Sequence, residues 1–197
     1  MRTWNLALAL LPAALLLSCD ELGRNAAKVF PVLEKVNEDY AEPSIPCDPP
    51  YSSPTARNGI VADITCDSEV QGNNATGTKL WGDTFYQKAF CTPERNQWDN
   101  GPEDIYRLKV PADLEATVTM VTDCAELDLV GVSWQERSVP QVQHHGAINQ
   151  CDMDINRKGG KLRLNAVGKD WYYLIGVDGR NGETGNYRLK VKCTTFR

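Results

Sequence analysis

The stretch CDMDINRKGG, in the last third of the chain, holds the residues best suited to bind a metal ion. Asp152, Asp154 and Asn156 alternate along it, as do the first three ligands of a calcium-binding loop. The rest of the EF-hand pattern fails, because Arg157 replaces the turn glycine and Arg163 replaces the bidentate glutamate. The sequence therefore allows calcium at this loop, and the alternative is a polar loop that binds nothing.

The chain has two histidines, the adjacent His144 and His145. A catalytic zinc ion usually takes three protein ligands, mostly from His, Cys, Asp and Glu. Adjacent residues in a loop point their side chains in different directions, so one metal ion rarely takes both. We expect a solvated loop here.

No stretch of the sequence carries a motif of covalent or phosphoryl-transfer catalysis. A GxSxG motif is absent, and Ser133 and Ser138 have no catalytic residues patterned around them. The glycine-rich run VDGRNGETGNY lacks the Gly-Lys-Ser/Thr of a phosphate-binding loop and is expected to form a hairpin loop. We predict that the chain is not an enzyme. A small metal-dependent or carboxylate-based hydrolase of the envelope is the alternative, because Asp and Glu are plentiful.

Aromatic residues are the remaining candidates for ligand binding. Trp134, Trp171 and Tyr172 are the ones we select, and Tyr172 has the opposite strand phase to Trp171 and Tyr173. Exposed rings on a β-sandwich stack on sugars or contact proteins. The alternative is that these rings belong to the core or cover strand edges.

The N-terminal stretch LLLSCD, residues 15–20, decides where the protein resides. The apolar run before it is broken by Pro12 and is far shorter than the roughly 20 residues that a membrane-spanning helix needs. It has the length of the apolar part of a signal peptide. Its last residues resemble the bacterial lipobox, with a small residue before Cys19, which in lipoproteins receives the lipid. We expect residues 1–18 to be a lipoprotein signal peptide and Cys19 to anchor the chain to a membrane of the cell envelope.

Composition narrows the classes of partner. The chain has 21 basic and 26 acidic side chains in 197 residues. It therefore lacks the excess of basic residues that is typical of proteins that bind nucleic acid. It has no polybasic stretch for anionic lipid. We expect an envelope protein or polysaccharide as partner.

Six cysteines remain in the mature chain besides Cys19. An even number in an exported chain indicates disulfide bonds, and six cysteines allow fifteen pairings. No CxxC motif is present, which disfavours a zinc ribbon or a thioredoxin-type redox site. Spacing alone leaves the pairing open among Cys47, Cys66, Cys91, Cys124, Cys151 and Cys193.

The sequence pattern divides the mature chain into an N-terminal tether and a C-terminal part rich in strands. Residues 19–57 read as a tether, with a short helix possible over 25–40 and a proline-rich end. From residue 58 apolar residues alternate with polar ones, as in half-buried strands. In YRLKVKC, for example, Tyr187, Leu189, Val191 and Cys193 share one face. Similar strands are expected at 106–110, 116–120 and 161–166, whereas 127–132 and 171–177 are more continuously apolar and are expected to be more central. Short strands of this kind indicate an antiparallel β-sandwich over residues 58–197.

The order of these strands resembles the bacterial pre-peptidase C-terminal domain. The segments that carry the resemblance are GPEDIY, LDL, the GKDWYYLIGVDG run and GNYRLKV. They include Gly101, Pro102, Glu103 and Tyr106; Leu127, Asp128 and Leu129; Gly168, Tyr172, Tyr173, Val177, Asp178 and Gly179; and Gly185, Tyr187, Leu189 and Val191.

The resemblance implies a jelly-roll-like β-sandwich without catalytic activity that assists localisation or binding. It also suggests the disulfides Cys124–Cys151, Cys66–Cys91 and Cys47–Cys193, and it leaves calcium as a possible ligand. The predicted function is therefore an envelope lipoprotein that binds or scaffolds an extracytoplasmic protein or polymer. A purely structural envelope component is a further alternative.

Overall fold

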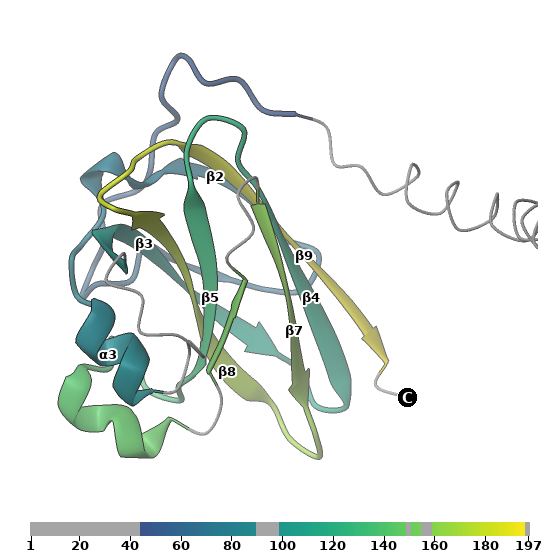
Figure 1. The fold of residues 1–197 in the computed structure, drawn as a ribbon. Coiled ribbons are helices and arrows are strands. Elements are labelled where there is room, and N and C mark those ends of the chain that lie inside the picture. Colours follow the sequence, from purple (N-terminus) through teal and green to yellow (C-terminus); the bar gives the residue numbers. More distant parts are fainter. Residues whose placement is uncertain (1–43, 90–98, 149–150, 155–158, 196–197) are drawn as a thin grey trace, which may run out of the picture. The chain divides into compact units, whose positions relative to one another are not determined.

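A computed structural model describes residues 44–89, 99–148, 151–154 and 159–195, with only the backbone for Asp99, Asn100 and residues 151–154. These residues form two sheets packed face to face, which confirms the all-β sandwich (Figure 1). The signal peptide, Cys19 and the possible helix at 25–40 lie outside the described residues. Within the described part, no helix is long and apolar enough to span a membrane.

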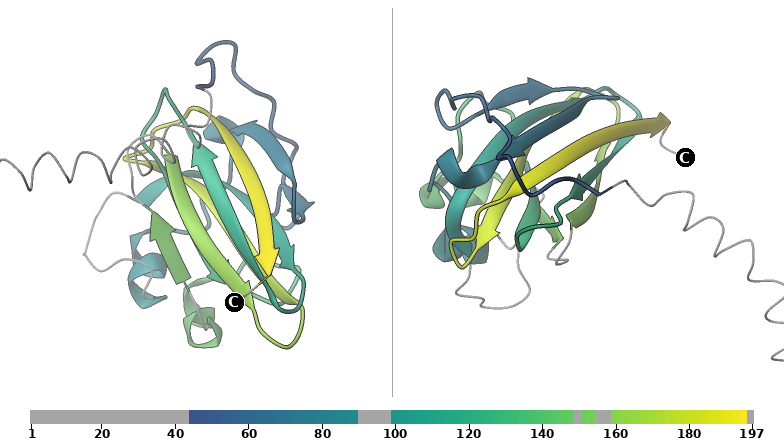
Figure 2. Two further views of the ribbon diagram at one scale, coloured as in Figure 1. Left: turned by 90° about the vertical axis from the view of Figure 1, so that its right-hand side faces the viewer. Right: turned by 90° about the horizontal axis from the view of Figure 1, so that it is seen from above.

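The first sheet has five strands, and the second has four. The order in the first is β1 (Ala62–Ile64), β3 (Asp99–Val110), β8 (Trp171–Arg180), β5 (Leu127–Ser133) and β6 (Cys151–Asp154). Only the pairing of β1 with β3 is parallel. The second sheet has the order β2 (Glu69–Asn73), β9 (Asn186–Thr195), β4 (Leu114–Val121) and β7 (Gly159–Ala166), and all its pairings are antiparallel (Figure 2).

The main core lies between the two sheets and follows the predicted alternation. In β9, Tyr187, Leu189 and Val191 are buried, whereas Lys192 is exposed. In β3, Tyr106, Leu108 and Val110 face the same core. In these two strands, period-2 patterning therefore predicts correctly which side faces the main core.

A second apolar cluster covers the outer face of the five-stranded sheet. The helix α3 (Asp83–Lys88) places Phe85 and Tyr86 in it, and β5 contributes Val130 and Val132. The 3-10 helix η2 (Val142–Ala147) lies beside α3, and a second one, η1 (Asn74–Thr76), follows β2. Because β5 is covered on both faces, all its residues are buried, and its apolar residues do not alternate strictly with polar ones.

The sandwich includes residues 44–57, which the sequence pattern assigned to the tether. Ile45 is buried, and its backbone N–H donates to Asp123 Oδ2 at 2.6 Å. The side-chain amide of Asn186 donates to three carbonyl oxygens of this segment, those of Pro46, Cys47 and Pro49. A proline-rich segment has few N–H groups of its own, so its carbonyls need donors from elsewhere. The packed domain therefore begins at about residue 44, not at residue 58.

Two disulfides are present, and they differ from the predicted scheme. Cys47 is bonded to Cys124, and Cys66 is bonded to Cys193. The predicted pairs Cys124–Cys151, Cys66–Cys91 and Cys47–Cys193 are therefore wrong, because each contains a cysteine that is bonded elsewhere. The reason is sheet order: β9 lies next to β2, so Cys193 comes close to the connection from β1 to β2 that contains Cys66. Cys91 and the side chain of Cys151 lie outside the described part.

Candidate functional site

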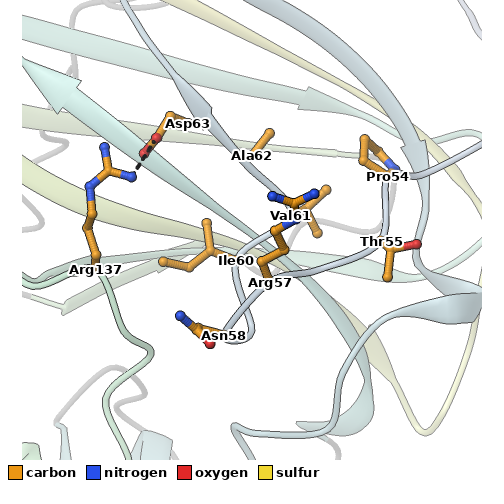
Figure 3. A pocket seen from close by; sticks show the side chains of 9 residues that line it. All are labelled: Pro54, Thr55, Arg57, Asn58, Ile60, Val61, Ala62, Asp63 and Arg137. Carbon is orange, nitrogen blue, oxygen red and sulfur yellow. Dashed lines mark ion pairs between the residues drawn. The ribbon is translucent and has the colours of Figure 1, made fainter.

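A pocket of about 520 Å³ opens beside the edge strand β1 (Figure 3). It is lined by the chain that leads into β1, by β1 itself and by one residue of the loop after β5. The lining residues are Pro54, Thr55, Arg57, Asn58, Ile60, Val61, Ala62, Asp63 and Arg137. Three of these residues are charged, so the pocket is the candidate functional site.

A tight turn positions Arg57 at the pocket. The backbone N–H and C=O of Arg57 bond to those of Ile60 at 2.8 and 3.0 Å. Asn58 and Gly59, the two residues between them, have φ of 54° and 81°. Two successive positive φ values define a type I′ turn, for which Asn-Gly is the preferred sequence. A Cβ at Gly59 would lie 2.6 Å from Leu80 Cδ1, so the turn packs closely on the domain.

The strand β1 positions Asp63 between two arginines. Asp63 is opposite Arg107 in the register of β1 and β3, and its Oδ1 lies 3.6 Å from Arg107 Nη1. Its other oxygen lies 3.1 Å from Nη1 of Arg137, which comes from the loop after β5 (Figure 3). Asp63 thus holds the guanidinium of the exposed Arg137 side chain at the pocket.

One predicted binding aromatic, Tyr172, lies next to this site. The guanidinium carbon of Arg107 lies 3.7 Å from the centre of the Tyr172 ring. Arg107 also donates to the backbone oxygen of Gln135 at 3.3 Å, and it is buried. The ion pair and the cation–π contact fix Arg107, which in turn fixes Asp63.

The pocket is positively charged, although the net charge of the whole chain is negative. Arg57 and Arg137 outnumber Asp63, and the net formal charge of the chain is −5. Within the described residues, Arg57 has no ion-pair partner. A guanidinium offers a planar set of donors that matches a carboxylate, so the arrangement is suited to bind an anionic group.

The other two predicted aromatics have structural positions. Trp134 is buried in the second apolar cluster, and its ring lies 5.8 Å from that of His144. Trp171 is half-buried against the main core, with Lys169 Nζ 4.7 Å from its ring centre. Neither ring lines the pocket.

The predicted calcium ligands are only partly described. Asp152 and Asp154 lie in β6, where the backbone is extended, whereas a calcium loop would turn at this point. Asn156 lies outside the described residues. Over the part of the chain with described side chains, no group of three His, Cys, Asp or Glu residues is placed to hold a metal ion.

The two histidines lie in the helix η2, and His144 takes part in its N-terminal cap. His144 Nδ1 accepts from the backbone N–H of Gln141 at 3.0 Å, and His145 Nδ1 lies 3.0 Å from the backbone oxygen of Val142. Both histidines are exposed, but they are on a 3-10 helix rather than in an irregular loop.

A row of buried carboxylates crosses the outer face of the five-stranded sheet. Glu103, Asp178 and Asp128 are neighbours in register on β3, β8 and β5, and each is at most 2% exposed. Tyr86 donates to Asp178 Oδ2 at 2.5 Å, and Arg180 donates to Asp128 Oδ1 at 2.8 Å. The row is a paired-carboxylate arrangement whose three side chains are buried, with Tyr86 of α3 in contact with Asp178.

Glu103 is the most perturbed acid of the row. Its Oε1 accepts from the backbone N–H groups of Leu80, at 2.7 Å, and Trp81. Its buried Oε2 has no hydrogen-bond partner among the described residues. Burial raises the pKa of Glu103 to about 7, although the two backbone hydrogen bonds act in the opposite direction.

Arg57, Asp63 and Arg137 were not selected from the sequence. The Asn58–Gly59 pair is a turn signal that could have placed Arg57 on a hairpin. No local signal identifies Arg137, because its role depends on a loop that meets β1 only in the folded domain.

Comparisons with solved structures include two weak likenesses. No family model matches the chain, and no curated protein matches it. A solved pre-peptidase C-terminal domain of collagenase from Bacillus anthracis covers 68% of this chain and 96% of its own, with 17% identity and a TM-score of 0.38. PliG, a periplasmic inhibitor of g-type lysozyme from Aeromonas hydrophila, covers 68% and 98%, with 12% identity and a TM-score of 0.34. Because both TM-scores lie below 0.5, neither likeness carries an argument about family or function.

Proposed function

We propose that this chain is a non-catalytic binding protein of the bacterial cell envelope, anchored through a lipid on Cys19. Two disulfides support an extracytoplasmic location, since such bonds persist mainly in oxidising compartments. The lipobox-like LLLSC supports the anchor. The binding site is the pocket beside β1, and its occupant is a protein segment that carries a carboxylate side chain.

The single observation that carries this proposal is the pair of arginines at an open pocket. Arg137 is already held by Asp63, so binding a carboxylate there requires little further ordering of its side chain. Arg57 is exposed and stands on a tight turn. Charge-assisted hydrogen bonds from two such groups favour an anionic ligand over a neutral one.

The strand edge indicates a protein rather than a sugar as the occupant. β1 pairs with β3 on one side and is the last strand of its sheet on the other. An edge strand offers backbone donors and acceptors to an extended segment of a partner. Since β1 is only three residues long, the side-chain contacts at Arg57 and Arg137 supply most of the specificity.

Selection from a random peptide library on the full mature chain tests the proposed ligand. Selected peptides are expected to be enriched in Asp and Glu, and the enrichment is expected to disappear with Arg57→Gln/Arg137→Gln. Removal of one charge-assisted contact typically weakens binding by roughly 10-fold or more. The matched control is Lys79→Gln/Lys88→Gln, which removes two exposed positive charges outside the pocket. Enrichment in basic or apolar peptides, or an unchanged selection by the arginine variant, would contradict the proposal.

A further inference from the structure

The outer face of the four-stranded sheet is a second charged surface, on the opposite side from α3. The strands β9 and β7 lie on either side of β4 in this sheet (Figure 2, left), and both carry basic residues. Five basic residues and two acidic ones occupy positions on these strands that alternate with the core-facing positions and lie on the outer face. The basic ones are Lys161, Arg163, Arg188, Lys190 and Lys192, and the acidic ones are Glu69 and Glu115.

Strand register arranges four of these residues in two rows. Lys190 and Lys161 flank Thr119 in one row, and Lys192 and Arg163 flank Thr117 in the next. Because adjacent strands are about 4.8 Å apart, each row spans roughly 10 Å, and the rows are about 7 Å apart. The charges therefore spread over a plane and do not follow a groove.

The basic residues of this face outnumber the acidic ones on and beside it, which are Glu69, Glu115 and Asp67. Lys192 Nζ lies 2.9 Å from Asp67 Oδ1, but both side chains are more than half exposed. Arg188 Nε lies 4.0 Å from Glu69 Oε1. An exposed pair such as Lys192–Asp67 contributes little and exchanges readily for other partners. The face thus remains positive in a chain whose net formal charge is −5.

We infer that this face binds an anionic membrane surface. Its planar spread of Lys and Arg fits a flat array of anionic headgroups, which attracts basic residues near it. None of the outward positions in these four described strands is aromatic, so the face lacks the rings that commonly stack on sugars. The choice of a membrane over a soluble polymer rests on the lipid anchor at Cys19, which would hold the domain close to the bilayer.

Vesicle binding by the full mature chain with Cys19→Ser tests this inference, because that chain has no lipid. We expect it to sediment with vesicles of equal parts phosphatidylglycerol and phosphatidylcholine, and not with phosphatidylcholine alone. Salt should weaken the binding. Lys161→Glu/Arg163→Glu should weaken it by at least about 10-fold. Lys79→Glu/Lys88→Glu makes the same charge change on the other side of the domain and should retain most of the binding.

Failure to bind the anionic vesicles would overturn the inference. So would binding of a soluble polyanion without vesicle binding, or an equal loss in both double variants. Circular dichroism of both variants checks that they remain folded, and both replaced pairs are exposed. The pocket residues stay intact in all these proteins, so a negative result would leave the proposed pocket function standing.

Discussion

Replacing Glu103 with Gln is expected to remove most of the pH dependence of stability. The native state binds the Glu103 proton more tightly than the unfolded chain does, since burial raises the pKa from its ordinary value to about 7. The contribution of Glu103 to the free energy of unfolding is therefore highest below about pH 4.5, and it falls as the pH rises to about 7. The loss amounts to about 3 kcal/mol, or roughly 6 to 12 °C in melting temperature.

Burial explains why the neutral form of Glu103 is favoured, because a charged carboxylate would lose its hydration there. Arg180, the cation in the same buried row, is bonded to Asp128. Tyr86 from α3 donates to Asp178, and Lys79 lowers the pKa of Glu103 only weakly. A neutral Glu103 keeps Oε1 as acceptor for the backbone of Leu80 and Trp81.

Thermal melts from pH 5 to pH 8 measure this effect. The wild-type protein is expected to lose stability over that range, whereas Glu103→Gln should lose little and be the more stable protein at pH 8. Glu136→Gln, an exposed position, should follow the wild type. Parallel curves for wild type and Glu103→Gln would show that Glu103 does not control the pH dependence.

Removing the Cys66–Cys193 disulfide is expected to destabilise the whole domain. The two cysteines are 127 residues apart, and closing so long a loop restricts the unfolded chain by about 4 to 5 kcal/mol in the chain-entropy model. We expect Cys66→Ser/Cys193→Ser to lower the melting temperature by roughly 8 to 20 °C.

The Cys47–Cys124 disulfide provides the matched control. Its two cysteines are 77 residues apart, so closing this loop costs the unfolded chain an entropy similar to that of the Cys66–Cys193 loop. It ties down a surface segment, however, that can open without unfolding the sandwich. Cys47→Ser/Cys124→Ser should therefore expose residues 44–53 to protease with a smaller change in melting temperature. Equal melting temperatures for the two double variants would contradict this assignment.

The strands could be predicted because their signal is local. Alternation in YRLKV and KLRLNA specifies a buried and an exposed face within a few residues. The short edge strands β1 and β2 and the helix α3 were not predicted. α3 has six residues and is held by Phe85 and Tyr86 in the second cluster, so tertiary packing rather than periodicity determines it.

The disulfides and the candidate site could not be predicted, because both depend on strand order and register. Cys66 meets Cys193 only because β9 is inserted between β2 and β4. Glu103, Asp128 and Asp178 were visible as separate motif residues, but register brings them into one row. Arg137 stands on the loop after β5, and no local sequence pattern predicts that this loop brings it to Asp63.

Site-specific photocrosslinking in cells tests the pocket most directly. A photoreactive residue at Thr55, in the pocket wall, is compared with one at Thr84, which is exposed on α3. The proposal predicts that Thr55 captures one recurrent extracytoplasmic protein through an acidic segment, and that Thr84 does not. Arg57→Gln/Arg137→Gln should abolish that capture. Identical neighbours at both positions, or capture that survives the arginine replacements, would contradict a binding function at this pocket.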